Sequence, residues 1–186
     1  KFAKLLETYD SLLLSKEYDS EFHGKNFGNV ELQKLMGKII IMVDRLNTSF
    51  LDCPSFYKFV NMTTNSVFAR ALHYHDIKHT SDMEELIDFN KQNMTFGMPD
   101  TGSNPSNPSS IVMREMGCQL LAMRYPIIDV NIEENDIFFD ENGYAFVLKP
   151  KNLRYIPVMI DAPPPQDPAL SFATKTVQSD FYSFNI

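Results

Sequence analysis

The sequence has few basic residues, few glycines and few cysteines, and each shortage excludes a class of protein. Its 17 Lys and Arg residues are outnumbered by 24 Asp and Glu residues, which gives a formal charge of −7. Binding to nucleic-acid phosphates requires clustered cations, so we expect no nucleic-acid partner. The seven glycines are not clustered, which excludes a Gly-rich loop for nucleotide phosphates.

Long hydrophobic runs are also missing. The run at 39–43 has five residues, whereas a helix needs ~20 to span a bilayer, so we expect no transmembrane segment. The two cysteines, Cys53 and Cys118, lie in apolar or mixed surroundings, which favours buried thiols in a reducing compartment over a disulfide framework. The 186 residues, 44% of them hydrophobic, suffice for a soluble globular domain.

Hydrophobic spacing predicts two helices. Apolar residues recur in a helical pattern over 2–14, and a second helix is expected over 84–92, capped by Ser81 or Asp82. Because the first pattern begins at once without an N-cap, we expect the sequence to start inside a longer polypeptide. The Pro-rich stretch at 99–110 predicts a long rigid loop, and long ordered loops are often functional.

Strands are predicted from short apolar runs. A short strand or helix is expected at 67–74, and residues 15–31 are expected to form a loop. Buried strands are expected in three further stretches: 35–43, 117–125 and 144–149.

Two groups of side chains have the chemistry of metal ligands. His75 and His79, at i and i+4, would share a helical face, and together with His73 and Asp76 they could bind a metal. Ordinary surface or core histidines explain the same pattern. Six carboxylates and no cation occur in 127–148; they could chelate Ca²⁺, but their spacing matches no EF-hand, and we favour a solvated connecting segment.

The chain changes character near its end, and we divide it into a domain over 1–158 and a Pro-rich aromatic tail over 159–186. The last twenty residues show neither helical nor strand periodicity. Prolines keep a backbone extended and aromatic side chains supply anchors, which predicts a tail that docks on a partner or on a groove of its own domain. The candidate partner-binding residues are Pro163, Pro164, Pro165, Phe172, Phe181, Tyr182, Phe184 and Ile186.

Three stretches, in order along the chain, are similar to sequence motifs of one enzyme family. Leu13-Leu14-Ser15 and then 32–41 (Leu-Gln-Lys-Leu-Met-Gly-Lys-Ile-Ile-Ile) are similar to leu-leu followed by leu-lys-gly-lys-ile-leu. Residues 89–99 (Phe-Asn-Lys-Gln-Asn-Met-Thr-Phe-Gly-Met-Pro) are similar to tyr-asn-lys-arg-his-leu-ser-arg-val-tyr-pro. Residues 117–119 (Gly-Cys-Gln) and 142–154, with Asn-Gly-Tyr and Val-Leu-Lys-Pro-Lys-Asn-Leu-Arg, complete the set. Together they resemble the eukaryotic-type phosphoinositide-specific phospholipase C catalytic barrel.

The resemblance carries an expected fold and an expected gap. The family folds as a distorted (β/α)₈ barrel, which needs ~250 residues. It therefore implies an α/β fold in which this chain is the C-terminal half of a TIM-type barrel with an extended Pro-rich tail. In the family, the catalytic histidines and the ligands of a catalytic Ca²⁺ lie on earlier strands. The resemblance thus implies no catalytic residue, no metal ligand and no cofactor here, with calcium needed only if a catalytic half lies upstream.

The matched positions that hold substrate in the family are altered. Where the family has phosphate-holding lysines, this chain has Met42, Val43 and Asp44, with only Arg45 cationic. Where the family has ser-arg-x-tyr, this chain has Thr95, Phe96, Gly97 and Met98. An Arg–phosphate pair is a charge-assisted bidentate contact, so its replacement by Phe is not neutral for such an enzyme. These positions are therefore degenerate.

The altered site favours a non-catalytic structural or interaction protein over an enzyme. With its fourteen asparagines and its tail, the chain resembles proteins encoded by large DNA viruses. This implies a minor capsid or virion component, located in the virion or the cytoplasm, with other protein subunits, including capsid proteins, as partners. The alternative is a calcium-dependent phosphoinositide phospholipase C whose catalytic half lies upstream of this chain.

Overall fold

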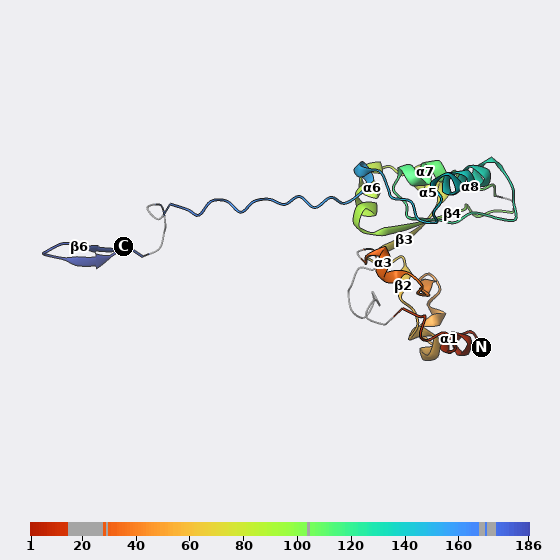
Figure 1. Ribbon diagram of the computed structural model, residues 1–186, viewed down its shortest axis with the longest axis horizontal. Helices are drawn as coiled ribbons and strands as arrows, with labels where there is room; N and C mark the ends of the chain where they lie inside the picture. The colour runs from red at the N-terminus through yellow and green to blue at the C-terminus, as the bar shows by residue number, and fades with distance from the viewer. Residues whose placement is uncertain (15–27, 29, 104, 168–169, 171–173) are drawn as a thin grey trace. The chain divides into compact units, whose positions relative to one another are not determined.

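The computed structural model describes residues 1–14, 28, 30–103, 105–167, 170 and 174–186. Contacts divide the chain into two compact units, Lys1–Ile156 and Pro157–Ile186, each of which is described by itself (Figure 1). None of the helices in the described part of the chain has the length and hydrophobicity of a transmembrane span.

The first half of the larger unit is built on short elements around a parallel pair of strands. Strand β1 (Met42–Asp44) pairs with β2 (Met62–Thr64). Ahead of β1, Leu13 forms an isolated parallel bridge with Ile39. The helices in this half are α1 (Phe2–Glu7), α3 (Leu32–Leu35), the 3-10 helix η3 (Thr48–Phe50) and α4 (Pro54–Tyr57).

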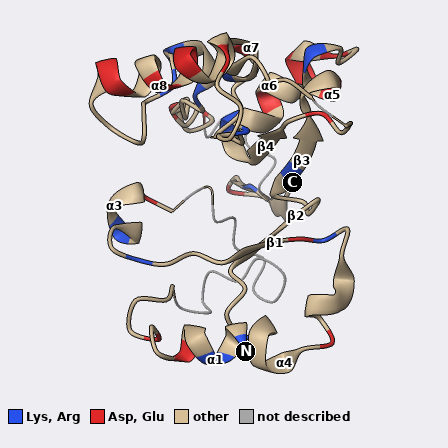
Figure 2. Ribbon diagram, turned by 90° about the vertical axis from the view of Figure 1, so that its right-hand side faces the viewer, with Lys and Arg blue, Asp and Glu red and all other residues tan. Residues whose placement is uncertain are grey.

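The second half contains a three-stranded parallel sheet with helices on one side. Strands β3 (Ala69–His73), β4 (Met94–Met98) and β5 (Leu120–Leu121) lie in that order. The helices are α5 (Tyr74–Lys78), α6 (Met83–Gln92), α7 (Ser110–Glu115), α8 (Val130–Asn142) and the 3-10 helix η4 (Lys151–Leu153). Figures 1 and 2 show α5, α6, α7 and α8 gathered on the same side of β3 and β4.

A hydrophobic core lies between these helices and the sheet. Ile77 of α5, Met113 of α7 and Ile132 of α8 are buried in one cluster. Gly97 of β4 allows their close approach, because a Cβ atom at this position would clash with the Met113 sulfur and lie 3.3 Å from the Ile77 Cδ1. The absence of a side chain at Gly97 thus sets how closely α5 and α7 lie on the sheet.

A second core joins the two halves of the larger unit. Ala69 and Phe96, on β3 and β4, pack with Leu14 and Met62 from the first half. Because successive side chains of a strand point to opposite faces, Phe96 and its neighbour Gly97 serve the two different cores. The three-stranded sheet is therefore covered on both faces, which is usual for parallel strands.

The expected half of a (β/α)₈ barrel is wrong. The five parallel strands of the larger unit form two separate sheets of two and three strands, with β2 and β3 not hydrogen-bonded to each other. A barrel requires each strand to be bonded on both sides around a closed circuit, and these strands are only two to five residues long. Within the described residues, the fold is mixed α/β with small parallel and antiparallel sheets.

Two of the predicted elements are confirmed. Strand β3 lies within the 67–74 stretch. Helix α6 lies where 84–92 predicts it, and the Asp82 carboxylate accepts a hydrogen bond from the Glu85 amide at 2.9 Å as the N-cap. The expected loop at 99–110 contains no helix or strand in 99–103 and 105–109, and α7 begins at its last residue.

Other predicted elements are wrong in extent or kind. The helix expected over 2–14 ends at Glu7, because the backbone of Leu12 and Leu14 instead bonds to Ile39. The buried strands expected in 35–43 and 117–125 shrink to β1 and β5. Residues 144–149 form no strand. The loop expected at 15–31 lies mostly outside the described residues.

The acidic stretch in 127–148 is mainly a helix, where a solvated connecting segment was expected. The Asp129 carboxylate caps α8 by accepting bonds from the amides of Asn131 and Ile132, and Gly143 ends it in the left-handed conformation with φ 68°. Asp at the N-cap and Gly at the other end are ordinary helix boundary signals. The cysteines also differ from each other: Cys118 is buried as expected, whereas Cys53 is exposed.

Candidate functional site

The positions that the resemblance matched to phospholipase substrate contacts make structural contacts in this chain. Thr95 is fully buried in β4, where its hydroxyl donates to the Asn90 carboxamide oxygen at 2.5 Å. Asp44 ends β1, and its Oδ1 accepts bonds from the Leu46 amide and the Thr64 hydroxyl. Both side chains therefore stabilise the turns and strands that carry them.

The remaining degenerate positions are apolar. Phe96 packs in the second core, and Met42 is partly exposed on β1. Met98 is the last residue of β4 and is paired with His73 of β3. None of these three side chains carries a charge or a strong hydrogen-bond donor, so they offer nothing to a phosphate group.

His73 and His75 lie at the carboxyl end of β3, next to the end of β4, where α/β proteins often bind ligands. A shallow pocket of about 390 Å³ is lined there by His73, His75, Asp76, Asp100 and Thr101. The His73 Nδ1 lies 2.9 Å from the Pro99 carbonyl oxygen, and the Asp100 carboxylate accepts a bond from the His75 amide.

The predicted helical face shared by two histidines is confirmed. The rings of His75, in the first turn of α5, and His79, its C-cap residue, lie 4.7 Å apart, centre to centre. Among the residues that the structure describes, no three His, Cys, Asp or Glu side chains are placed to share a metal ion. The two rings therefore make an aromatic contact with each other.

Asn90 is a buried polar centre that sequence reasoning missed. Its carboxamide nitrogen donates to the Met116 carbonyl at 2.9 Å, and its backbone carbonyl accepts from Gln119 at 2.7 Å and Lys149 at 2.8 Å. The Gln119 side-chain oxygen also accepts a hydrogen bond from the Thr95 backbone amide. Gln119 of the Gly-Cys-Gln motif and Lys149 of the Leu-Lys-Pro motif thus both bond to Asn90 of α6.

The Lys149 ammonium and the Cys118 thiol lie in this same region. Burial lowers the pKa of Lys149 to about 8, and the nearby thiol of Cys118 opposes this shift. Burial raises the pKa of the Cys118 thiol to about 12, so that thiol stays protonated and unreactive at neutral pH. In the sequence, both residues occur in the motifs that carry the resemblance, but membership of a motif does not predict that two side chains lie close together.

The smaller unit contains an antiparallel hairpin, which the lack of periodicity in the last twenty residues had not predicted. Strand β6 (Thr176–Gln178) pairs with β7 (Ser183–Asn185), with Val177 opposite Phe184. The amide of Ser179 donates to the Tyr182 carbonyl across the turn. The rings of Tyr182 and Phe184 stack with their centres 5.5 Å apart.

The predicted partner-binding side chains are exposed wherever the structure describes them. Phe181 is 95% exposed at the hairpin turn, and Tyr182, Phe184 and Ile186 are exposed as well. Pro163, Pro164 and Pro165 are exposed and lie in no helix or strand. Phe172 lies outside the described residues.

Three further exposed apolar residues were missed as candidate anchors. Val158, Met159 and Ile160 are each more than four-fifths exposed. They follow Ile156 and Pro157 in an almost uninterrupted apolar run, which is the signal that could have identified them. With the hairpin residues they make an apolar surface spread over the smaller unit.

The carboxylates of α8 are distributed around a helix that packs on α7. Arg114 of α7 pairs with Glu134 of α8, and its guanidinium lies 3.9 Å from the centre of the Phe138 ring. Glu133 and Glu141 are exposed. Figure 2 shows this acidic helix beside α7.

No known protein family matches this chain, and no curated protein resembles it closely enough in sequence to count as a relative.

Proposed function

We propose that this chain is a non-catalytic interaction protein that binds other protein subunits through residues 157–186. One observation carries the proposal: every described residue of this unit is exposed, although many of them are large and apolar. Exposed apolar patches, such as residues 158–160 and the stacked rings of the hairpin, mark interaction sites in soluble proteins.

The hairpin itself supports a docking role. A two-stranded hairpin without a hydrophobic face to pack on is at best marginally stable in water, and all six residues of β6 and β7 are exposed. A partner surface would cover the stacked Tyr182 and Phe184 rings and supply the missing hydrophobic contact. Burial of an apolar side chain of this size contributes about 1.5–3 kcal/mol.

The prolines reduce the entropic cost of docking. Proline restricts the backbone before binding, so Pro163, Pro164 and Pro165 lose less conformational freedom than other residues would. The apolar residues 158–160 on one side and the hairpin on the other therefore suit an arm that contacts a partner at two places.

The finer expectations remain proposals. A role as a minor capsid protein, located in the virion or the cytoplasm, rests on the resemblance to viral proteins alone. The alternative is a phospholipase C with its catalytic half upstream. Arg45 is then the one cation at the positions matched to phosphate-holding lysines, and residues 95–98 contain none. Calcium-dependent hydrolysis of phosphatidylinositol by the complete polypeptide would contradict the non-catalytic part of the proposal.

Photo-cross-linking tests the docking arm in the cells that produce the protein. The full chain carries benzoylphenylalanine in place of Tyr182, and adducts are identified by mass spectrometry after irradiation. We expect adducts with one protein species. The double variant Tyr182→Ser, Phe184→Ser should then weaken binding to that purified protein at least about tenfold, because two anchors are lost.

The matched control places the same photoreactive residue at Val67, an 80% exposed position in the larger unit. It should give no adduct with the species captured from position 182. Equal capture from both positions, or unchanged affinity of the double variant, would contradict the proposal.

A further inference from the structure

Helix α8 has an unpartnered apolar face opposite the face that packs on the protein. Its inner face carries the buried Ile132 and Asn135. Val130 and Ile137, on the outer face, are 74% and 55% exposed. A helix with apolar residues on opposite sides is normally covered on both, and in the larger unit α8 is covered on one.

The outer face forms a continuous stripe along the helix. Its residues follow the spacing i, i+3, i+4, i+7, i+8, i+11, which places them on one side of an α-helix. They line a shallow groove of about 260 Å³: Val130, Glu133, Glu134, Ile137, Phe138 and Glu141. Glu134 and Phe138 contact Arg114 of α7 and form the side of the groove next to α7, so the part without a partner is formed by the other four. Val130 and Ile137 are seven residues apart, the repeat by which a second helix packs along a first.

The charges around the groove are negative. Arg114 pairs with Glu134, but Glu133 and Glu141 have no ion pair among the described residues. The sequence from 127 to 148 contains no Lys or Arg. The groove thus combines an apolar floor with an acidic rim, and positively charged side chains would be attracted to it.

Charge also argues against two occupants that this chain could supply. Residues 157–186 contain three aspartates and one lysine, so this segment would be repelled by the rim. A second copy of α8 would bring the same carboxylates into contact, which is also unfavourable. Phosphate backbones and anionic lipid surfaces are repelled for the same reason.

We propose that the outer face of α8 binds a cationic amphipathic helix of a partner protein. In this mode, apolar residues of the partner helix lie on Val130 and Ile137, and its Lys or Arg residues pair with Glu133 and Glu141. The site is separate from the docking arm of residues 157–186, so either can be correct without the other.

A designed peptide tests this site on the full chain. The probe is a fluorescent helix of about 18 residues made of Leu and Lys, with Leu at i, i+3, i+4 and i+7. Its binding is followed by fluorescence anisotropy at about 0.15 M salt, where weak long-range attraction is screened. We expect saturable binding that Ile137→Ala and Glu141→Lys each weaken about tenfold. Lysine near the end of a helix is favourable, so Glu141→Lys should not unfold α8.

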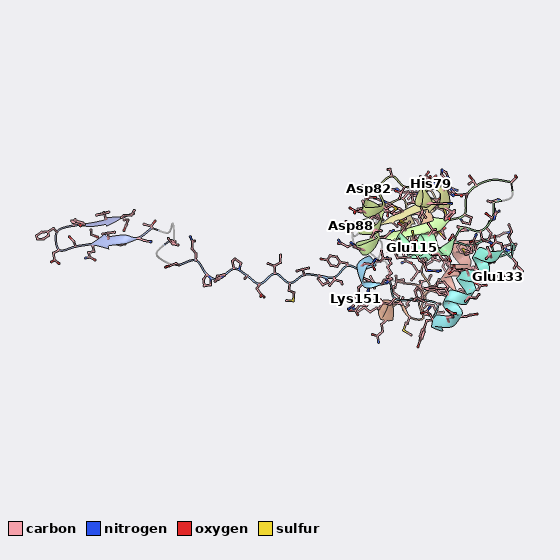
Figure 3. The ribbon with its side chains drawn as sticks, turned by 90° about the horizontal axis from the view of Figure 1, so that it is seen from above. His79, Asp82, Asp88, Glu115, Glu133 and Lys151 are labelled. Atoms are coloured by element: carbon pink, nitrogen blue, oxygen red, sulfur yellow. The ribbon has the colours of Figure 1, made fainter. Side chains whose placement is uncertain are left out.

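The control variant is Glu115→Lys, which makes the same charge change in the last turn of α7, away from the groove lining. Figure 3 labels Glu115 and Glu133. Binding should be nearly unchanged in this variant. Equal weakening by Glu115→Lys, equal binding of a Leu and Glu peptide, or equal binding of a scrambled Leu and Lys peptide would overturn the proposal.

Discussion

At the level of single residues, Lys149 carries an ammonium group that burial makes harder to keep charged. Its ammonium donates to the Asn90 carbonyl, and burial lowers its pKa to about 8, below the ~10.4 of a solvated lysine. Between these two values the folded chain has released a proton that the unfolded chain still binds. The free energy of unfolding therefore rises with pH across this window.

The first prediction concerns this pH dependence. From about pH 7 to about pH 9, the free energy of unfolding should rise more in the wild-type protein than in Lys149→Met. The difference should stay below the ~1.4 kcal/mol per pH unit that one proton allows, because the ammonium remains partly solvated and its interactions are screened. Urea unfolding followed by circular dichroism at several pH values measures it.

Two features make the result interpretable. Above about pH 9, Cys118 acts in the opposite direction, because burial raises its pKa to about 12 and the unfolded thiol releases its proton first. The comparison is therefore restricted to lower pH. Lys151→Met changes an exposed lysine two residues away and should keep the wild-type slope. A wild-type slope in Lys149→Met as well would contradict the assignment.

At the scale of elements, Asn90 links α6 to three other parts of the chain. Its side chain forms hydrogen bonds with the Thr95 hydroxyl in β4 and the Met116 carbonyl after α7. Its backbone carbonyl accepts hydrogen bonds from the side chains of Gln119 and Lys149. A buried network of satisfied hydrogen bonds favours one arrangement of the elements that it joins.

We therefore predict that Asn90→Ala strongly destabilises the larger unit. The substitution leaves the buried Thr95 hydroxyl and the Met116 carbonyl without these partners, and each unsatisfied group costs about 1–3 kcal/mol. The free energy of unfolding should fall by about 2–4 kcal/mol in urea titrations. Asn142→Ala, at the exposed end of α8, should change it by less than about 0.5 kcal/mol. Similar losses in both variants would contradict the role of Asn90.

Features that depend on neighbouring residues could be predicted from the sequence, whereas features that depend on distant residues could not. Helix α6 could be predicted because Asp82 and the apolar spacing act within a few residues. The bonds of Asn90 could not, because they join residues up to 59 positions apart. The stretch 144–149 has the composition of a strand, but Tyr144, Phe146 and Leu148 are exposed and no neighbouring strand pairs with it in the described residues.

The candidate site was predictable only where it depends on composition. Exposed aromatic and proline residues in the last part of the chain could be recognised from the sequence. The groove on α8 could not, because the lack of cations suggested a solvated segment and hid the boundary signals at Asp129 and Gly143. The resemblance is limited to short sequence motifs, and these do not predict which strands pair, because paired strands can be distant in sequence.

At the scale of the whole molecule, the buried apolar residues are confined to one unit. Every buried hydrophobic side chain in the described part of the chain lies between Leu6 and Leu153. The unit Pro157–Ile186 adds exposed apolar area without a core. Stability and partner binding are therefore expected to reside in different units.

The final prediction separates these two properties by truncation. A chain that ends at Ile156 should unfold in urea with a free energy within about 0.5 kcal/mol of that of the full chain, since it keeps the whole core. A chain that ends at Leu148 loses Lys149 and the buried Leu153, and burial of a leucine alone contributes about 1.5–3 kcal/mol. The second truncation should therefore be clearly less stable than the first. Comparable destabilisation by both would show that residues 157–186 belong to the folded core and that the proposed division between a stable unit and a docking arm is wrong.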